Sequence, residues 1–320
     1  MNKQTTESPL NPDLSEDNRK NFTLVIPAYN ESPVIRDLVD ELKSTFNRHR
    51  LSGEIILVDD GSTDDTRQIA QTLTADWPLV RVLHHRKNLG KTEAIISAFQ
   101  ASTRENMIIF DADLQHSPEE IPRFLQELQK GSDIVTGIKI GNYQKSFVST
   151  IYNWLSKKIF RVPVSDLNSM KAFKSEILAG MHLRHDWHRF FVVLAYHRGY
   201  SVSEIPIRLF PRKAGVSKYS SPLRIVPAII DMMSVWFLLL FSRKPLILFG
   251  FTGMLMIISG ILVGALAFYF RFALGTGFRP LLYLVILLET VGFLMLGFGL
   301  IAEMIAQVRE EIQQIKRHQS

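Results

Sequence analysis

Two carboxylates and an amide stand close together in the stretch "DADLQ", as Asp111, Asp113 and Gln115. The preceding run "NMIIF" is typical of a buried strand, and "SPEEIPRFLQELQ" after it is typical of a capped helix. We therefore expect the three side chains in the turn between a strand and a helix. They offer only oxygen atoms, which suit Mg²⁺ or Mn²⁺ and do not suit zinc. The alternative is that the carboxylates only cap the turn.

Two other predicted strands end in unusual polar stretches. "FTLVIPAYNE" ends in Tyr29, Asn30 and Glu31, and "EIILVDDGSTDDT" contains Asp59 and Asp60. Taken alone, the second stretch is an ordinary turn with a helix cap. Strand and helix signals alternate from "FTLVIP" to "DIVTG", which predicts a mostly parallel sheet with helices on both faces. Ligands of such sheets bind beyond the carboxyl ends of the strands, so we expect the three stretches to converge on one crevice.

The stretch "NLGKTEA" has a rival interpretation, because Gly90, Lys91 and Thr92 look like the end of a phosphate-binding P-loop. A P-loop needs another glycine five residues before Gly90, where this chain has His85. No G-x-G-x-x-G follows the first predicted strand either, which argues against a dinucleotide-binding fold. Lys91 is either near a phosphate or simply solvated.

Several motifs, in order, carry a resemblance to a known family. They are "VIPAYNE", "ILVDDGSTDDT", "NLGKTEA", "DADLQHSPEEIP", "SDIVTG", "DLNSMKAF", "DWHRFFVVLAYHRGYSVSEIPI" and "PRKAGVSKY". Over about residues 22 to 220 the chain resembles family 2 glycosyltransferases, in particular the polyprenyl-phosphate hexosyltransferases of the dolichyl-phosphate mannose synthase type. The resemblance implies an α/β GT-A fold, Rossmann-like with a mostly parallel sheet. It also implies a UDP- or GDP-hexose donor, Mg²⁺ or Mn²⁺, inversion at the anomeric carbon and a polyprenyl phosphate acceptor.

The resemblance also assigns roles to residues. Asp111, Asp113 and Gln115 match its metal-binding DxDxQ element, and Arg212 and Lys218 match a basic pair that grips phosphate. The implied catalytic set is Asp111, Asp113, Arg212 and Lys218. The residues assigned to the nucleotide sugar are Pro27, Tyr29, Glu31, Asp59, Asp60, Lys91 and Lys139.

Two positions depart from the family pattern. Thr92 replaces a common glycine after Lys91, and "DLNSMKAF" is one residue shorter than usual, which affects the expected sugar pocket. His185 and His188 are expected to be structural, because a phosphate monoester acceptor is already anionic and needs little help from a general base. Trp187, His188 and Arg189 are alternatively expected at the acceptor mouth.

The second part of the chain is apolar. Pro245 to Phe270 and roughly Leu281 to Ala302 are long enough to cross about 30 Å of hydrocarbon as helices. A shorter apolar stretch before them contains Pro227 and Asp231, and we expect it to lie in the interface rather than to form a third span. The predicted segments are a polar tail (1–20), the GT-A domain (21–221), an amphipathic interfacial helix (222–243), two transmembrane helices (244–305) and a cytoplasmic basic tail (306–320).

Composition limits the possible functions. The chain has no cysteine, which excludes disulfides and thiolate metal sites. A net charge of +6 over 320 residues suits membrane lipids better than nucleic acid. The N-terminus has no apolar region of a signal peptide, so we expect the catalytic domain and both termini in the cytoplasm, attached to the inner membrane. Glu289, within the second span, is expected to pack against the other span or a neighbouring subunit of a homo-oligomer.

Two other functions remain open at this point. A processive polysaccharide synthase is disfavoured because the chain lacks a Q-x-x-R-W segment and has too few spans for an export channel. A non-catalytic membrane scaffold is disfavoured because the expected metal ligands are all present.

Overall fold

The computed structural model describes residues 14–140, 155–181, 183–211, 225–241, 244–275, 277 and 279–318. The chain divides into two compact units, Met1–Met232 and Met233–Ser320. The division falls within one helix, α9 (Ile225–Phe241).

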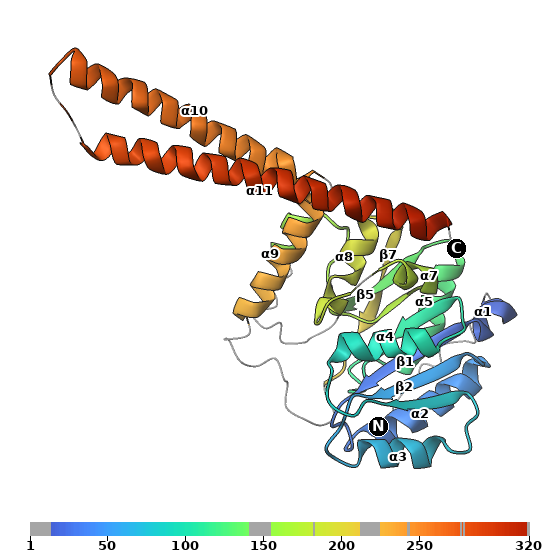
Figure 1. Ribbon diagram of the computed structural model, residues 1–320. Coiled ribbons are helices and arrows are strands. Elements are labelled where there is room, and N and C mark those ends of the chain that lie inside the picture. Colours follow the sequence, from blue (N-terminus) through green and yellow to red (C-terminus); the bar gives the residue numbers. More distant parts are fainter. Residues whose placement is uncertain are drawn as a thin grey trace. The chain divides into compact units, whose positions relative to one another are not determined.

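A seven-stranded mixed sheet forms the centre of the first unit (Figure 1). Its strand order is β3-β2-β1-β4-β6-β5-β7. The four pairs β1–β2, β1–β4, β2–β3 and β5–β7 are parallel, whereas β6 is antiparallel to both of its neighbours. The strands are β1 (Phe22–Ala28), β2 (Glu54–Asp59), β3 (Val80–His84), β4 (Asn106–Ile109), β5 (Ile134–Ile140), β6 (Lys171–Lys174) and β7 (Val202–Arg208).

Helices connect the parallel strands, because a parallel pair needs a long crossover connection, which is usually a helix. They form because their apolar residues recur every three or four positions, as in α2, where Leu38, Leu42 and Phe46 are buried. Ser117 caps the predicted helix after "DADLQ" by accepting a hydrogen bond from the Glu119 amide at 3.3 Å. The helices are α1 (Glu16–Lys20), α2 (Ile35–His49), α3 (Thr66–Thr74), α4 (Lys91–Ala101), η1 (Pro118–Glu120), α5 (Ile121–Gln129), α7 (Ser175–Ala179), η2 (Trp187–Arg189) and α8 (Phe191–Tyr196).

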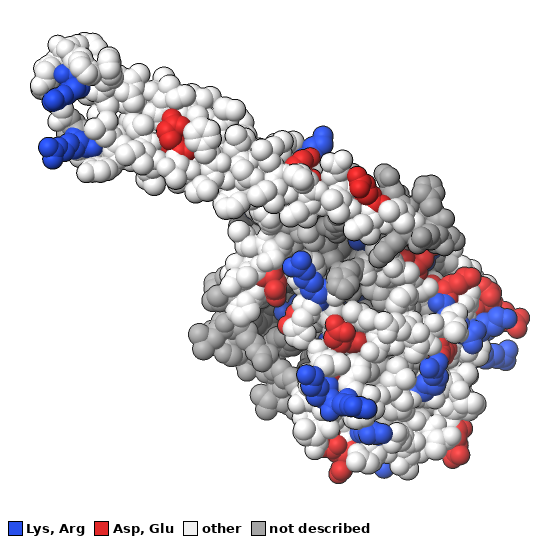
Figure 2. All heavy atoms as spheres, in the orientation of Figure 1, with Lys and Arg blue, Asp and Glu red and all other residues white. Residues whose placement is uncertain are grey.

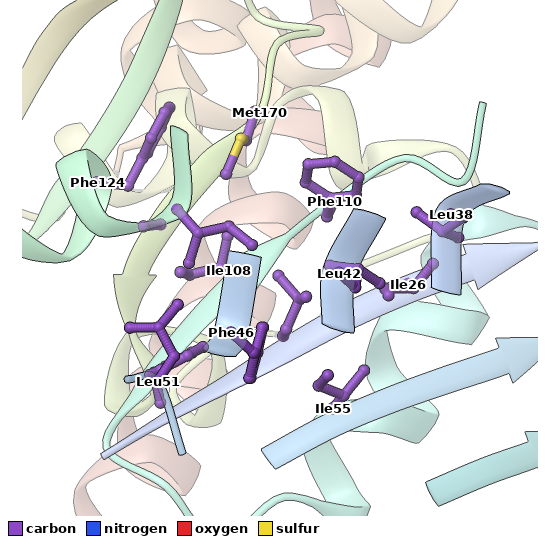
Figure 3. Close-up of a cluster of buried hydrophobic side chains, with 14 of the residues drawn as sticks. Ile26, Leu38, Leu42, Phe46, Leu51, Ile55, Ile108, Phe110, Phe124 and Met170 are labelled. Atoms are coloured by element: carbon purple, nitrogen blue, oxygen red, sulfur yellow. The ribbon is translucent and has the colours of Figure 1, made fainter. Parts of the chain in front are cut away.

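The main hydrophobic core lies between the sheet and helices α2 and α5 (Figure 3). Alternate residues of β1 and β4, such as Ile26 and Ile108, meet Leu42 of α2 and Phe124 of α5 there. Leu14 is also buried in this core, and Ser15 caps α1. The last residues of the predicted polar tail therefore belong to the folded domain.

The expected GT-A-like architecture is confirmed, with strands at all five predicted positions. Strands β6 and β7 were not predicted. β6 has only four residues, and β7 contains Pro206, which weakens a strand signal. Both strands lie beyond "DIVTG", where the clear alternation of strand and helix signals ends.

The second unit is a hairpin of α10 (Pro245–Phe272) and α11 (Arg279–His318). Within it, Pro245–Phe272 and Arg279–Val308 are long and apolar enough to cross a membrane, with mean hydropathies of 2.5 and 2.3. In each helix only 11% of the apolar 18-residue stretch is buried, which argues against these being core helices of a soluble protein. Figure 2 shows that the visible face of the hairpin carries few charged side chains between its ends. Whether α9 lies in the interface stays a prediction.

Glycines bring the two helices of the hairpin close together. A Cβ atom added at Gly253 would lie 2.7 Å from the backbone oxygen of Gly292, closer than real Cβ atoms approach. A Cβ at Gly260 would lie 2.6 Å from Oε1 of Glu289, so this carboxyl packs against the other helix of the hairpin. Close backbone approach at small residues is a usual basis of helix packing in membranes.

We expect Gly253→Val to separate the hairpin, because overpacking against backbone costs roughly 1–3 kcal/mol. The matched control is Gly297→Val, since Gly297 has open space where its Cβ would stand. The readout is a disulfide between cysteines introduced at Gly264 and Val285, because a Cβ added at Gly264 would lie 3.8 Å from both methyl carbons of Val285. Gly253→Val should slow its formation, and Gly297→Val should not. Equal rates in the two variants would contradict close packing at Gly253.

Candidate active site

Three strand ends converge because β1 lies between β2 and β4 and is parallel to both. Val25 accepts a hydrogen bond from the Phe110 amide on the β4 side. Pro27, two residues later, faces the same side and has no N–H to continue that ladder. The pairing with β4 therefore ends there, and the chain after Phe110 turns away from the sheet with Asp111 and Asp113.

The loops after β1 and β2 are joined by hydrogen bonds. The Asn30 amide donates to Ser62 Oγ at 3.0 Å, and the Thr63 amide donates to Asn30 Oδ1 at 2.9 Å. The Glu31 amide donates to Thr66 Oγ1 at 2.8 Å. Gly61 has φ +69, and a Cβ there would meet the Lys87 backbone at 2.3 Å. The "DDGS" turn thus needs its glycine and holds the "AYNE" loop in a fixed position.

Asp59 and Asp60 are buried and bonded to protein groups. Asp59 Oδ1 accepts from the Ser62 amide at 3.1 Å, and Oδ2 lies 2.7 Å from Nδ1 of His84. Asp60 accepts from the amides of Leu89 and Gly90 at 2.9 and 2.8 Å, and its Oδ1 lies 2.7 Å from Nδ1 of His85. Asp60 therefore fixes the start of α4. The two histidines were not predicted as site residues.

Asp111 forms an ion pair with the ammonium group of Lys91, the first residue of α4. Burial alone raises the pKa of a carboxyl, but the charge and hydrogen bond of Lys91 outweigh it and hold the pKa of Asp111 well below its usual range. Charges at His116 and Lys171 act in the same direction. Asp111 is thus an anion at neutral pH, beside a cation on a neighbouring element. The structure places Lys91 in the predicted site.

Asp113 lies in the same turn and is only 7% exposed. Its Oδ1 accepts from the Gln115 amide at 3.2 Å. Leu114 between them has φ 52, a strained conformation for a branched residue, and such strain gathers at functional sites. Among the described residues no three His, Asp or Glu side chains gather as metal ligands. A cation at this turn would therefore be held by the carboxylates of Asp111 and Asp113 and by the side-chain oxygen of Gln115. Its other oxygen ligands would come from a bound substrate or from water.

Two more cations lie close to this edge of the sheet. Lys139, at the end of β5, forms a 2.9 Å ion pair with Asp166 in the "DLNSMKAF" segment, and both side chains are mostly buried. Lys171 of β6 is buried beside Ile109, its register partner in β4. Its ammonium donates to the carbonyls of Leu167 and Ser169 at 2.9 and 3.0 Å. Asp166 and Lys171 were not predicted as site residues.

Thr92, one of the departures from the family pattern, has a local explanation. Its hydroxyl lies 2.9 Å from Nδ1 of His188, and both side chains are buried. Burial, followed by the charges of Lys91 and Arg189, lowers the pKa of His188 well below its usual value. A neutral, buried, hydrogen-bonded imidazole fits the structural role predicted for His188.

The structure gathers most of the predicted residues at one edge. Around the ends of β1, β2, β4 and β5 and the start of α4 it places Pro27, Tyr29, Glu31, Asp59, Asp60, Lys91, Asp111, Asp113, Gln115 and Lys139. The predicted phosphate-gripping pair, Arg212 and Lys218, lies outside the described residues. The individual roles of these residues stay predictions.

Lys171 makes a pH dependence testable. Burial, then repulsion from Lys91, lowers its pKa from 10.5 to about 7, against the attraction of Asp111 and Asp166. Between these pH values the unfolded chain binds more protons at this residue than the folded chain, so stability rises with pH. Melting temperatures of the wild type and Lys171→Met, measured in detergent from pH 7 to about pH 9.5, should show the wild type gaining relative to the variant. Parallel curves would exclude a buried lysine with a lowered pKa.

Comparisons with known proteins agree with this geometry. The family model "Glycosyl transferase family 2" matches residues 23–190. The undecaprenyl-phosphate 4-deoxy-4-formamido-L-arabinose transferase of Pseudomonas fluorescens (strain Pf0-1) is 31% identical over 301 residues, covering 91% of this chain and 86% of the relative. The protein of the same name from Salmonella choleraesuis (strain SC-B67) is 27% identical over 308 residues, covering 93% and 92%.

Solved structures share the fold. Glucosyl-3-phosphoglycerate synthase from Mycobacterium tuberculosis, in complex with Mn²⁺, UDP and phosphoglyceric acid, has a TM-score of 0.55 and 19% identity, covering 69% of this chain and 78% of that one. The same enzyme with Mg²⁺ and UDP also has a TM-score of 0.55, with 17% identity and coverages of 68% and 81%. The ordered motifs, the convergent strand ends and the match over more than half of the chain together show that this protein belongs to glycosyl transferase family 2.

Proposed function

We propose that this protein transfers a sugar from a nucleotide-sugar donor to a polyprenyl phosphate in a membrane, giving a polyprenyl-phosphate sugar. The observation that carries the proposal is the extent of the similarity to the undecaprenyl-phosphate transferases. This similarity covers 91% of the chain, which is a larger share than the first unit, Met1–Met232, makes up. The apolar hairpin is therefore part of what the relatives share, which a lipid-linked acceptor explains.

The residues at the sheet edge can serve this reaction. Asp111 and Asp113, with Gln115, would hold Mg²⁺ or Mn²⁺, the ions named with the solved relatives. Their oxygen-only donors and the anionic state of Asp111 fit such a cation. When bound, the cation supplies stabilisation of the charge that develops on the leaving diphosphate. Lys91, which already pairs with Asp111, adds a cation to the same place.

The acceptor supplies its own nucleophile. A phosphate oxygen of the polyprenyl phosphate attacks the anomeric carbon while the bond from that carbon to the diphosphate breaks, with inversion. Because this oxygen is already anionic, no proton transfer to a base is required. This agrees with a site in which His188 is buried and bonded to Thr92. Arg212 and Lys218 are proposed to hold the phosphates, Arg by its fork of donors and Lys as a point charge.

Two kinds of sugar are candidates for the transferred group. The family branch suggested by the sequence motifs transfers hexoses, whereas the relatives are named for 4-deoxy-4-formamido-L-arabinose, a pentose derivative. The test is to incubate membranes containing the protein with undecaprenyl phosphate, Mn²⁺ and radiolabelled UDP- and GDP-sugars of both kinds. A charged, lipid-soluble product supports the proposal. A long polymer would indicate a polysaccharide synthase, and no product with any donor would overturn the transferase.

We expect Asp113→Asn to lower turnover by at least about two orders of magnitude, because it removes charge from a site that offsets a dication while keeping the side chain's shape. The control is Asp76→Asn, which makes the same change at an exposed position between α3 and β3. Product formation is measured as above, at several Mn²⁺ concentrations. Near-normal turnover with an unchanged Mn²⁺ dependence would leave Asp113 as a turn residue only.

Two spans place both ends of the hairpin on one side, and we propose that this side is cytoplasmic. The chain has no native cysteine, so single cysteines at Thr276 and Ser320 report topology without background. In intact cells an impermeant maleimide should label Thr276→Cys, and it should label Ser320→Cys only after permeabilisation. Labelling of Ser320→Cys in intact cells would rule out this orientation.

A further inference from the structure

Two adjacent histidines end strand β3 beside the carboxylates of the "DDGS" turn. His84 is the register partner of Asp59, and its Nδ1 lies 2.7 Å from Asp59 Oδ2. His85 follows, with Nδ1 2.7 Å from Asp60 Oδ1 and its backbone amide donating to the Asp59 carbonyl at 2.9 Å. Each carboxylate thus has its own imidazole.

The two imidazoles differ at their second ring nitrogen. Nε2 of His85 lies 2.9 Å from Ser97 Oγ of α4, and the side chain is 10% exposed. Both of its nitrogens are therefore used inside the protein. The side chain of His84 is 30% exposed, and no described residue provides a hydrogen-bond partner for its Nε2. Of the pair, His84 is the one whose ring is available to a ligand.

The carboxylate next to it is not available in the same way. Asp59 is 0% exposed, and its two oxygens already bond the Ser62 amide and His84. A carboxylate only accepts hydrogen bonds, so Nδ1 of His84 must carry the proton that joins them. In the neutral ring Nε2 is then an acceptor. At this strand end the atom open to a ligand is therefore Nε2 of His84, a hydrogen-bond acceptor, and not an oxygen of Asp59.

The place of His84 in the sheet fits one end of a nucleotide. In the order β3-β2-β1-β4, His84 ends β3 and the Asp111 turn follows β4. Three strand spacings of about 4.8 Å separate them, roughly 14 Å. That span is comparable with an extended nucleoside diphosphate whose phosphates lie at the Asp111 and Asp113 turn. The nucleobase then lies at the ends of β2 and β3.

We infer that His84 is a specificity-determining residue that reads the hydrogen-bonding edge of the donor's nucleobase. This inference rests on the proposed function, which supplies the nucleotide. An acceptor at Nε2 matches bases that present a ring N–H, as uracil does at N3 and guanine at N1. It opposes cytosine and adenine, which present a bare ring nitrogen at the same positions. His85 is a positioning residue, because it acts on Asp60 and the start of α4.

The experiment measures binding of free nucleoside diphosphates to the purified full chain in detergent with Mn²⁺, by calorimetry. UDP is compared with CDP and GDP with ADP, because each pair has the same ring system and differs on the edge that is read. His84→Asn keeps a side-chain N–H close to the place of Nδ1, where it can bond Asp59, and removes Nε2. His85→Asn is the matched control at the neighbouring position.

In the wild type, UDP is expected to bind better than CDP, or GDP better than ADP. His84→Asn should weaken binding of the preferred nucleotide roughly three- to tenfold, the worth of one hydrogen bond, and leave binding of the other member of the pair unchanged. His85→Asn should change both members of a pair by the same factor. Equal losses for all four nucleotides in His84→Asn overturn the inference and leave the proposed transferase activity intact. A wild type that binds no nucleotide overturns both.

Discussion

The site depends on the parallel pairing of β1 with β2 on one side and β4 on the other. Parallel strands end at the same edge, so residues that are about 30 and 80 positions apart in the chain arrive together. Pro27 ends the ladder with β4 at this edge, where the chain must leave the sheet. The "AYNE", "DDGS" and "DADLQ" stretches therefore become one surface.

A second constraint is electrostatic. Asp59, Asp60 and Asp111 crowd the same edge, and each has a donor from another element, namely His84, His85 with two backbone amides, and Lys91. Such hydrogen bonds replace the water that a carboxylate loses when the protein folds around it. It also keeps these side chains in place without a ligand, so the proposed diphosphate and its cation would meet a site that is already arranged.

The features that could be predicted depend on residues close together in the sequence, whereas those that could not depend on pairing between distant strands. Strands β1 to β5 and the capped helix after Ser117 follow from periodicity and turn residues within a dozen positions. His84 and Lys171 could not be assigned in this way, because their significance comes from register. His84 matters as the partner of Asp59 across β2 and β3, and Lys171 as the partner of Ile109 across β4 and β6. A pair of histidines at a strand end, following a pair of aspartates at the previous one, was the available signal.

The hairpin and the first unit meet different physical requirements of the proposed reaction. A nucleotide sugar is highly charged and needs the polar strand ends, whereas a polyprenyl chain is insoluble in water and confines its phosphate to the membrane surface. In the described part of α10, Gly253 and Gly260 are buried at contacts with α11 while Ile247, Phe251 and Leu262 remain exposed. That pattern reverses the usual arrangement of a soluble helix, because lipid rather than protein covers the large apolar side chains. In the proposed reaction, anchoring the transferase in this way would restrict its search for the acceptor to two dimensions. That would explain why the similarity to the relatives extends beyond the sheet into the hairpin.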